Sequence, residues 1–352
     1  MRWDSLRLDS SAYGTAPPLI ERGAVARTFD APEFRGMTFY EVHAKSIVSH
    51  VPAASLMPFR WTINPYRGCS HACSYCFARN SHTYLELDAG RDFDTKVVVK
   101  VNAPQLLRAK LASPRWAGEH IAMGTNVDCY QRAEGRYRLM RGIIEALRDA
   151  ANPFSSLTKG TLILRDLDLL LESAEVTEVG LNVSAGFVDK SLWRAIEPGT
   201  PAPERRLDAC AALNDAGLRC GVLMGPVVPF LSDSPAQLEA AVRQAAQAGA
   251  AHVMPIVLHL RPGAREWFLR WLREAHPELM PRYAELYGRG AYARKDYQAR
   301  IAGQVRELAG RYGVGRQAAP RGRTAARPAA SPAPARERLS PAAAAHEQLT
   351  LL

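Results

Sequence analysis

Three cysteines lie within the segment NPYRGCSHACSYCFARN, where Cys69, Cys73 and Cys76 have the spacing C-x3-C-x2-C. Thiolates placed so closely on one loop can bind three irons of a four-iron four-sulfur (4Fe-4S) cluster, and because no fourth cysteine is near, the fourth iron stays open to another ligand. The alternative is a zinc site completed by His71 or His82. Structural zinc sites usually combine two well-separated ligand pairs, which this sequence lacks, so the spacing favours the cluster.

The elements that must position these cysteines follow a repeating pattern. Short apolar, β-branched runs alternate with stretches of helical periodicity, which is typical of a parallel sheet with crossover helices. The expected strands are residues 61–64, 120–125, 154–158, 178–184, 220–227 and 252–258, and the expected helices are 72–86, 103–112, 135–150, 166–174, 204–216, 235–248 and 264–275. We therefore expect an α/β fold, a partial (β/α)6 barrel, with reactive groups at the carboxyl ends of its strands.

Composition divides the chain into three regions. Residues 1–55 are expected to form an irregular N-terminal extension, within which 36–52 has the pattern of a strand or a short helix. Residues 56–312 hold the barrel domain and its C-terminal helices. Residues 313–352 are rich in Ala, Pro and Arg, and they cannot bury enough apolar surface to order themselves, so we predict a disordered tail.

Charge and cysteine usage limit the class of protein. Lys and Arg outnumber Asp and Glu by 45 to 35, a net charge of +10, of which six arginines and two glutamates from Gly315 onward contribute +4. This balance permits a nucleic-acid partner without requiring one. Clustered cysteines do not resemble a secreted disulfide framework, and no apolar run is long enough for a membrane span. We expect a cytoplasmic protein with no membrane partner.

The pattern C-x3-C-x-aromatic-C, with Tyr75 as the aromatic residue, resembles the signature of the radical S-adenosylmethionine (SAM) superfamily. The resemblance implies that Cys69, Cys73 and Cys76 ligate a 4Fe-4S cluster and that SAM chelates the open iron. One electron, from a donor of the flavodoxin or ferredoxin type, would then cleave SAM to methionine and a 5′-deoxyadenosyl radical, which abstracts hydrogen from a substrate.

The same resemblance implies further contacts to SAM at the strand ends, in the motifs GTN, LTKG, GLNVS and GVLMGPVV. The residues concerned are Tyr75, Gly124, Thr125, Asn126, Lys159, Asn182, Ser184, Gly221 and Gly225. In GTN only Gly124 matches the family's Gly-Gly-Glu, at its first position. In GVLMGPVV, Val228 stands where the family has an acid. Each motif also has a structural alternative. GTN could be an ordinary strand-end turn, Lys159 a solvated lysine, and Asn182 and Ser184 polar side chains hydrogen-bonded within the fold.

Longer strings, among them DCYQRAE and EPGTPAPERRLDACAALNDAGLRCGVLMGPVVPFLSD, resemble the spore photoproduct lyase-like group known as DNA repair photolyases, over residues 36–275. In spore photoproduct lyase a cysteine near the end of the second strand donates hydrogen. Gly124 stands in its place here and Cys129 follows five residues later, so the resemblance makes Cys129 a candidate hydrogen donor. The alternative is that Cys129 is a small packed apolar residue.

Two polar groups have both a functional and a structural interpretation. Asp128, Tyr130, Gln131 and Glu134 either shape substrate binding or cap the following helix. A set of arginines either contacts phosphates or forms solvated helix faces. These arginines are Arg132, Arg136, Arg138, Arg141, Arg205 and Arg206.

The last five residues, Gln348–Leu352, resemble the peptide with which bacterial polymerases and repair proteins bind the sliding clamp, although a leucine replaces the final phenylalanine. We carry clamp binding as a hypothesis, with a chance pentapeptide as its alternative.

The leading hypothesis is a radical SAM enzyme that acts on DNA or a nucleotide-derived substrate. One alternative is radical modification of a protein, peptide or metabolite. The alternative from another class is a zinc-stabilised nucleic-acid-binding module.

Overall fold

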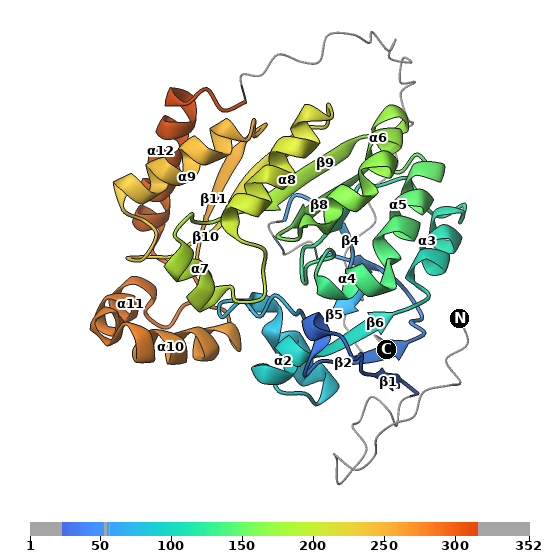
Figure 1. Ribbon diagram of the computed structural model, residues 1–352, viewed down its shortest axis with the longest axis horizontal. Helices are drawn as coiled ribbons and strands as arrows, with labels where there is room; N and C mark the ends of the chain where they lie inside the picture. The colour runs from blue at the N-terminus through green and yellow to red at the C-terminus, as the bar shows by residue number, and fades with distance from the viewer. Residues whose placement is uncertain (1–22, 53–54, 56, 316–352) are drawn as a thin grey trace, which may run out of the picture.

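The computed structural model describes residues 23–315 apart from 53, 54 and 56 (Figure 1). Most of the N-terminal arm, and nearly all of the predicted disordered tail with its clamp-like peptide, lie outside the described residues. No helix among the described residues combines the length and apolar character needed to cross a bilayer.

A seven-stranded sheet forms the centre of the molecule, in the order β11-β10-β9-β8-β7-β4-β3. Its strands are β3 (Val48–His50), β4 (Trp61–Ile63), β7 (Ile121–Met123), β8 (Phe154–Thr158), β9 (Val179–Ser184), β10 (Cys220–Val227) and β11 (Val253–Val257). The six strands from β4 to β11 are parallel, which confirms the predicted α/β fold, and β3 pairs antiparallel with β4 at one edge. The strand interpretation of segment 36–52 is therefore correct for β3.

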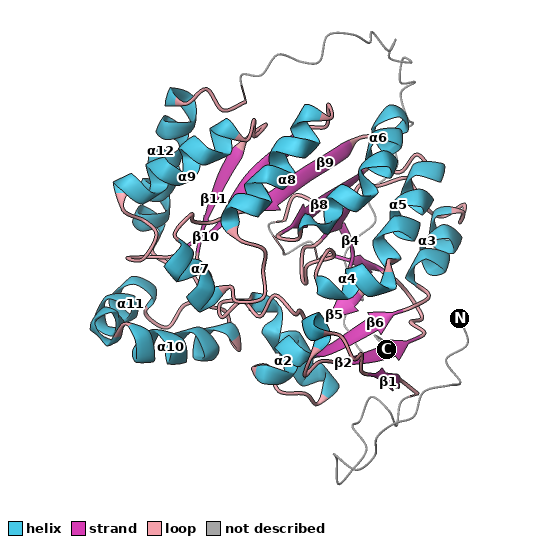
Figure 2. Ribbon diagram, in the orientation of Figure 1, coloured by secondary structure: helices cyan, strands magenta, loops and turns pink. Residues whose placement is uncertain are grey.

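Crossover helices cover one face of this sheet (Figure 2). They include α3 (Ala103–Leu111), α5 (Leu139–Asp149), α6 (Leu167–Val176), α8 (Pro203–Asp215) and α9 (Pro235–Gln247). Helix α9 shows how the sequence specifies such a helix. Ser234 and Gln237 form a capping box around Pro235, and Leu238, Ala241, Val242 and Ala245 bury one face at helical spacing.

Side-chain alternation gives the two faces of the sheet different characters. Leu181 and Val183 of β9 are buried with Cys220 of β10, and the Cys220 carbonyl contacts Cys210 of helix α8. Asn182 and the other intervening residues therefore face away from the helices. This helix-free face carries Asn182, Ser184, Gly221 and Leu223 in register.

A smaller sheet, in the order β1-β2-β6-β5, supports the cysteine loop. It comprises β1 (Val25–Arg27), β2 (Thr38–Val42), β5 (Tyr66–Arg67) and β6 (Lys96–Lys100). Strand β5 pairs antiparallel with β6 and ends two residues before Cys69. The sequence did not predict β5 or β6, because β5 is only two residues long and its partner lies about 30 residues away.

Two expected helices differ in the structure. The helix expected over 72–86 is a loop followed by the 3-10 helix Phe77–Leu85 and the short helix α2 (Arg91–Thr95). The helix expected over 135–150 is divided into α4 (Arg132–Tyr137) and α5, which meet at Arg138, where a φ of 52° interrupts the helical path.

The remaining helices follow this pattern or extend it. Helix α7 (Lys190–Ile196) lies between β9 and α8, whereas α10 (Ala264–Ala275), α11 (Met280–Tyr287) and α12 (Lys295–Arg311) follow the last strand (Figure 1). Helix α10 has the predicted bounds, and α12 packs against α9 and β11.

Candidate active site

The cysteine loop is held in shape by Arg79, which is fully buried. Its Nε and Nη2 donate to the carbonyl of Cys73 at 3.2 and 2.9 Å, while Nη1 donates to the Gly90 carbonyl at 2.8 Å. Asp94 accepts from Nη2 at 2.8 Å and neutralises the charge. One guanidinium therefore joins the loop to the segment before β6 through several charge-assisted hydrogen bonds.

The loop is also bound to the segment that follows α7. Ser74 N donates to the Ile196 carbonyl at 2.9 Å, and Gly199 N donates to the His71 carbonyl at 3.1 Å. A Cβ on Gly199 would lie 2.0 Å from the Ser70 oxygen, so only glycine permits this approach.

The three thiols are suited to separate irons. Cys69 and Cys73 are buried, Cys76 is half-buried, and none forms a disulfide. Burial raises the pKa of Cys73 to about 12 and raises those of Cys69 and Cys76, so iron binding must displace protons from all three. Among the described residues no group of three or more possible ligands converges on a single ion. Three thiols on one loop fit a cubane, which takes one thiolate per iron, better than one zinc ion.

Both histidines of the zinc alternative are engaged elsewhere. His71 Nδ1 lies 3.4 Å from Asp128 Oδ2, and His82 Nε2 lies 2.8 Å from the Lys96 carbonyl. The side chain of His82 also contacts the Phe93 ring edge-on. These contacts use one ring nitrogen of each histidine, so the preference for a cluster over zinc rests on the three cysteines of the loop.

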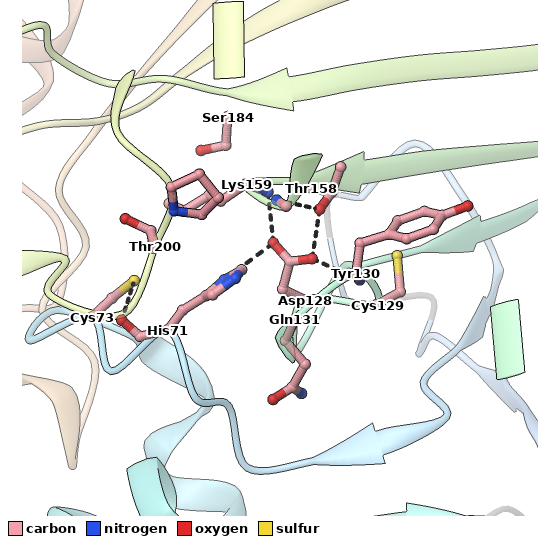
Figure 3. Close-up of polar contacts among 12 residues, drawn as sticks. His71, Cys73, Asp128, Cys129, Tyr130, Gln131, Thr158, Lys159, Ser184 and Thr200 are labelled. Carbon is pink, nitrogen blue, oxygen red and sulfur yellow. Dashed lines mark hydrogen bonds and ion pairs between the residues drawn. The ribbon is translucent and has the colours of Figure 1, made fainter. Parts of the chain in front are cut away.

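Asp128 is the centre of a hydrogen-bond network beside the loop (Figure 3). Its carboxylate accepts from Thr158 Oγ1 and Lys159 N, each at 2.6 Å, and from Tyr130 N at 2.9 Å. Burial acts to raise the pKa of Asp128, but His71 and these donors hold it well below its usual range. The ends of β7 and β8 are thus joined to the cysteine loop through one carboxylate.

A second buried network lies behind Tyr75. The Tyr75 hydroxyl donates to Glu197, which also forms an ion pair with Arg206. Arg206 donates further to the Ser184 carbonyl at 3.2 Å and to the Pro201 carbonyl at 2.7 Å. Burial acts to raise the pKa of Glu197, but the charges of Arg206 and Lys159 hold it below its usual value. Arg206 is therefore a buried structural cation, and its assignment to a phosphate-contacting or solvated face was wrong.

Several residues predicted to contact SAM do gather near the cysteines. Lys159 Nζ lies 5.8 Å from the centre of the Tyr75 ring, and Ser184 Oγ donates to the Gly225 carbonyl at 2.9 Å. Tyr75, Lys159, Ser184 and Gly225 thus belong to one region at the carboxyl ends of β8, β9 and β10.

Other predicted SAM contacts lie apart from this region or are already engaged. Gly221 is at the amino-terminal end of β10, where a Cβ would meet the His252 ring at 2.3 Å. Asn182 Oδ1 lies 2.8 Å from His252 Nε2. Thr125 Oγ1 shares a 2.6 Å hydrogen bond with Thr62, and Asn126 follows it on the same turn. The structure therefore does not support SAM contacts at Gly221 or Asn182, because the His252 ring lies against Gly221 and is hydrogen-bonded to Asn182.

Cys129 is fully buried, and its thiol lies 3.5 Å from Ser156 Oγ on the helix-covered side of β8. A thiol enclosed in this way favours the packed-residue alternative over hydrogen donation. Gly124 has a φ of 73°, and a Cβ there would lie 1.9 Å from the Leu157 oxygen. No cysteine fits at Gly124 without a backbone shift.

The polar cluster after β7 is mainly structural. Gln131 donates to the Gly68 carbonyl and accepts from Ser70 N, at 2.9 and 3.0 Å. Glu134 accepts from Leu139 N and Met140 N in the first turn of α5, as the capping alternative predicted. Sequence reasoning missed the His71–Asp128 pair and the role of Glu197. For Asp128 the only sequence signal was its place shortly after an expected strand. For His71 it was its place between two cysteines.

Comparison with known proteins agrees with this geometry. The model of the radical SAM superfamily matches residues 63–242. An uncharacterised protein of Mycobacterium tuberculosis (strain H37Rv) is 49% identical over 297 residues, 84% of this chain and 87% of the relative. An uncharacterised protein of Methanocaldococcus jannaschii is 33% identical over 174 residues, 49% of this chain and 62% of the relative. The chain therefore belongs to the radical SAM superfamily.

The fold also has a solved counterpart. A spore photoproduct lyase mutant with bound AdoMet and dinucleoside spore photoproduct superposes with a TM-score of 0.60, covering 78% of this chain and 79% of that one, at 14% identity. This likeness shows a shared fold, consistent with the group that the sequence resembles, and it leaves the substrate of this chain to be argued from its own site.

Proposed function

We propose that this chain is an enzyme that holds a 4Fe-4S cluster on Cys69, Cys73 and Cys76, cleaves SAM reductively and acts on DNA or a nucleotide-derived substrate. The observation that carries the proposal is one loop with three free thiols, fixed on both sides by Arg79 and Gly199. When bound, the cluster and SAM supply one-electron cleavage to methionine and a 5′-deoxyadenosyl radical.

The residues of this chain supply position and charge. Tyr75 is oriented by its hydrogen bond to Glu197, and Lys159 places a cation beside Tyr75, where it suits the carboxylate of SAM. Ser184 and Gly225 offer a hydroxyl and a close backbone approach at the neighbouring strand ends. Burial of Cys69 and Cys73 keeps bulk water from the cluster.

The substrate class is supported by two observations. Exposed arginines on α4 lie close to the cysteine loop, and the spore photoproduct lyase of similar fold holds a dinucleoside lesion. Phosphate contacts by such arginines would position a nucleic acid without selecting its sequence. A flavodoxin- or ferredoxin-type donor is the proposed source of the electron, and clamp binding by Gln348–Leu352 is a further proposal that concerns residues outside those described.

Deuterium transfer tests this function. The anaerobic, reconstituted enzyme is reduced with SAM present and supplied with ultraviolet-irradiated oligonucleotides deuterated at the thymine methyl group. Deuterium in 5′-deoxyadenosine supports a DNA substrate. If 5′-deoxyadenosine forms without deuterium and no lesion is repaired, that DNA-lesion substrate is wrong. Deuterated peptides and metabolites then test the alternative of radical modification of other molecules.

A further inference from the structure

A cavity of about 560 Å³ opens beside the cysteine loop, next to the Asp128 network. Its walls come from the loop itself, from the segments after β7 and β8, and from the segment after α7. They include His71, Tyr130, Arg132, Arg136, Gly160 and Gly199. None of the residues that the resemblance assigns to SAM lines this cavity. Its volume lies in the range of pockets that hold small molecules.

His71 brings a buried polar group to the wall of this cavity. Its side chain is only 4% exposed, and its Nδ1 faces the carboxylate of Asp128. An ionised carboxylate can only accept, so Nδ1 donates to it, and Nε2 is the ring nitrogen left to contact a ligand. Within residues 23–315, leaving aside the three that are not described, no side chain or backbone group bonds Nε2. A ligand hydroxyl, which can both donate and accept, would satisfy it.

Two arginines give the cavity positive charge. Arg132 and Arg136 lie one turn apart on α4, and both are exposed. Arg132 donates to the carbonyl of Glu33 at 3.5 Å, and Arg136 lies over the Phe29 ring at 4.9 Å. Neither forms a salt bridge with any of the residues that the structure describes, and the single carboxylate on the wall, that of Glu33, offsets only one charge.

The wall is closely packed at two glycines and open at a third. At Gly160 and Gly199 a Cβ would lie within 2.2 Å of a carbonyl oxygen of the protein, so glycine keeps the wall compact there. Gly135 has space, because its nearest neighbour would be Leu162 Cδ1 at 3.7 Å. Arginines bind phosphate through paired, charge-assisted hydrogen bonds.

We propose that this cavity binds a phosphate ester that also carries a hydroxyl group. The phosphate contacts Arg132 and Arg136, and the hydroxyl forms a hydrogen bond with His71 Nε2. Sugar phosphates, free nucleotides and internucleotide phosphates share this chemistry. Because His71 stands between Cys69 and Cys73, a ligand in the cavity touches the loop that holds the proposed cluster.

Equilibrium dialysis of the reconstituted full-length protein tests the site, with ribose 5-phosphate, thymidine 5′-monophosphate and thymidylyl-thymidine as separate probes. The tightest of the three identifies the source of the phosphate. Arg132→Gln with Arg136→Gln removes two charge-assisted contacts, and we expect Kd to rise at least about tenfold. The charge-matched control, Arg115→Gln with Arg273→Gln, alters exposed arginines outside the cavity and changes Kd by less than about twofold.

A second pair of variants separates charge from shape. Gly135→Glu and Gly135→Gln place side chains of equal size at the cavity wall, and only the first is negative. The proposal predicts that Gly135→Glu binds at least about tenfold more weakly than Gly135→Gln. Equal binding by these two variants, or no measurable binding of any probe to the wild type, would overturn the proposal. Dialysis needs no SAM and no reductant, so its result is independent of the radical chemistry.

Discussion

Glu197 and Arg206 form an ion pair in which each side chain is only 1% exposed, directly behind the tyrosine of the cysteine loop. They are nine positions apart in sequence, and the loop 197–202 folds back so that they meet. Because both charges are removed from water, each depends on the other.

Loss of Glu197 should therefore be costly. Glu197→Gln leaves Arg206 buried without a counter-charge, which we expect to lower the free energy of unfolding by about 3–5 kcal/mol. Urea unfolding of the apoprotein measures this. The control, Glu172→Gln, breaks the exposed pair with Arg148 and should cost at most about 1 kcal/mol. Equal effects of the two substitutions would contradict the structural role of the buried pair.

Arg79 should be required for the shape of the cysteine loop. Arg79→Lys keeps the charge but cannot reach the Cys73 carbonyl, the Gly90 carbonyl and Asp94 together. Each buried acceptor left unpaired costs roughly 1–3 kcal/mol, so we expect less than about half of the wild-type iron after reconstitution. Arg91→Lys, on the exposed side of α2, is the control. Full iron content in the Arg79 variant would show that the loop keeps its shape without the guanidinium.

Gly199→Ala tests the approach between the loop and the segment after α7. The added Cβ would lie 2.0 Å from the Ser70 oxygen, so one of the two segments must move. We expect a lower melting temperature and weaker retention of iron. Gly303→Ala, in the interior of α12 with no atom within 4 Å of the new Cβ, should instead stabilise by up to about 1 kcal/mol. Unchanged iron retention in Gly199→Ala would contradict the close contact.

Acid should weaken the Asp128 network. The pKa of Asp128 is depressed in the folded chain, below the usual value of about 3.9. A depressed carboxyl contributes stability that is complete above the unfolded pKa and is lost as the pH falls through the folded pKa. The difference in unfolding free energy between wild type and Asp128→Asn should therefore be about 1–3 kcal/mol at pH 7 and shrink below about pH 4. A difference that stays constant from pH 7 to pH 3 would contradict this account.

Local patterns predicted the main sheet well. Strands β8 and β10 have the predicted bounds, because Phe154–Thr158 and Cys220–Val227 are short, apolar or β-branched, and end at polar or proline-containing turns. The cysteine spacing likewise predicted the superfamily correctly. Each of these signals lies within a short stretch of the chain, so it can be recognised in a single sequence.

Local sequence patterns did not predict the contacts between residues that are distant in the chain. Arg206 lies on α8 among polar residues, and only the fold reveals that Glu197, Ser184 and Pro201 enclose it. The expected helix over 72–86 was wrong because contacts to other segments, from Arg79 to Gly90 and Asp94 and from Gly199 to His71, hold the loop in its shape. Gly221 and Asn182 were assigned to SAM by motif position alone, whereas the register brings both to His252.

Anaerobic reconstitution tests the central claim most directly, with iron, sulfide and 5′-deoxyadenosine measured in wild type and in a variant carrying Cys69→Ala, Cys73→Ala and Cys76→Ala. Cys210→Ala, in α8, is the control for loss of a buried thiol outside the loop. The account predicts about four irons per chain and reductive release of 5′-deoxyadenosine from the wild type and the control, and neither from the triple variant. A wild-type protein that binds zinc in place of iron and leaves SAM intact would contradict it.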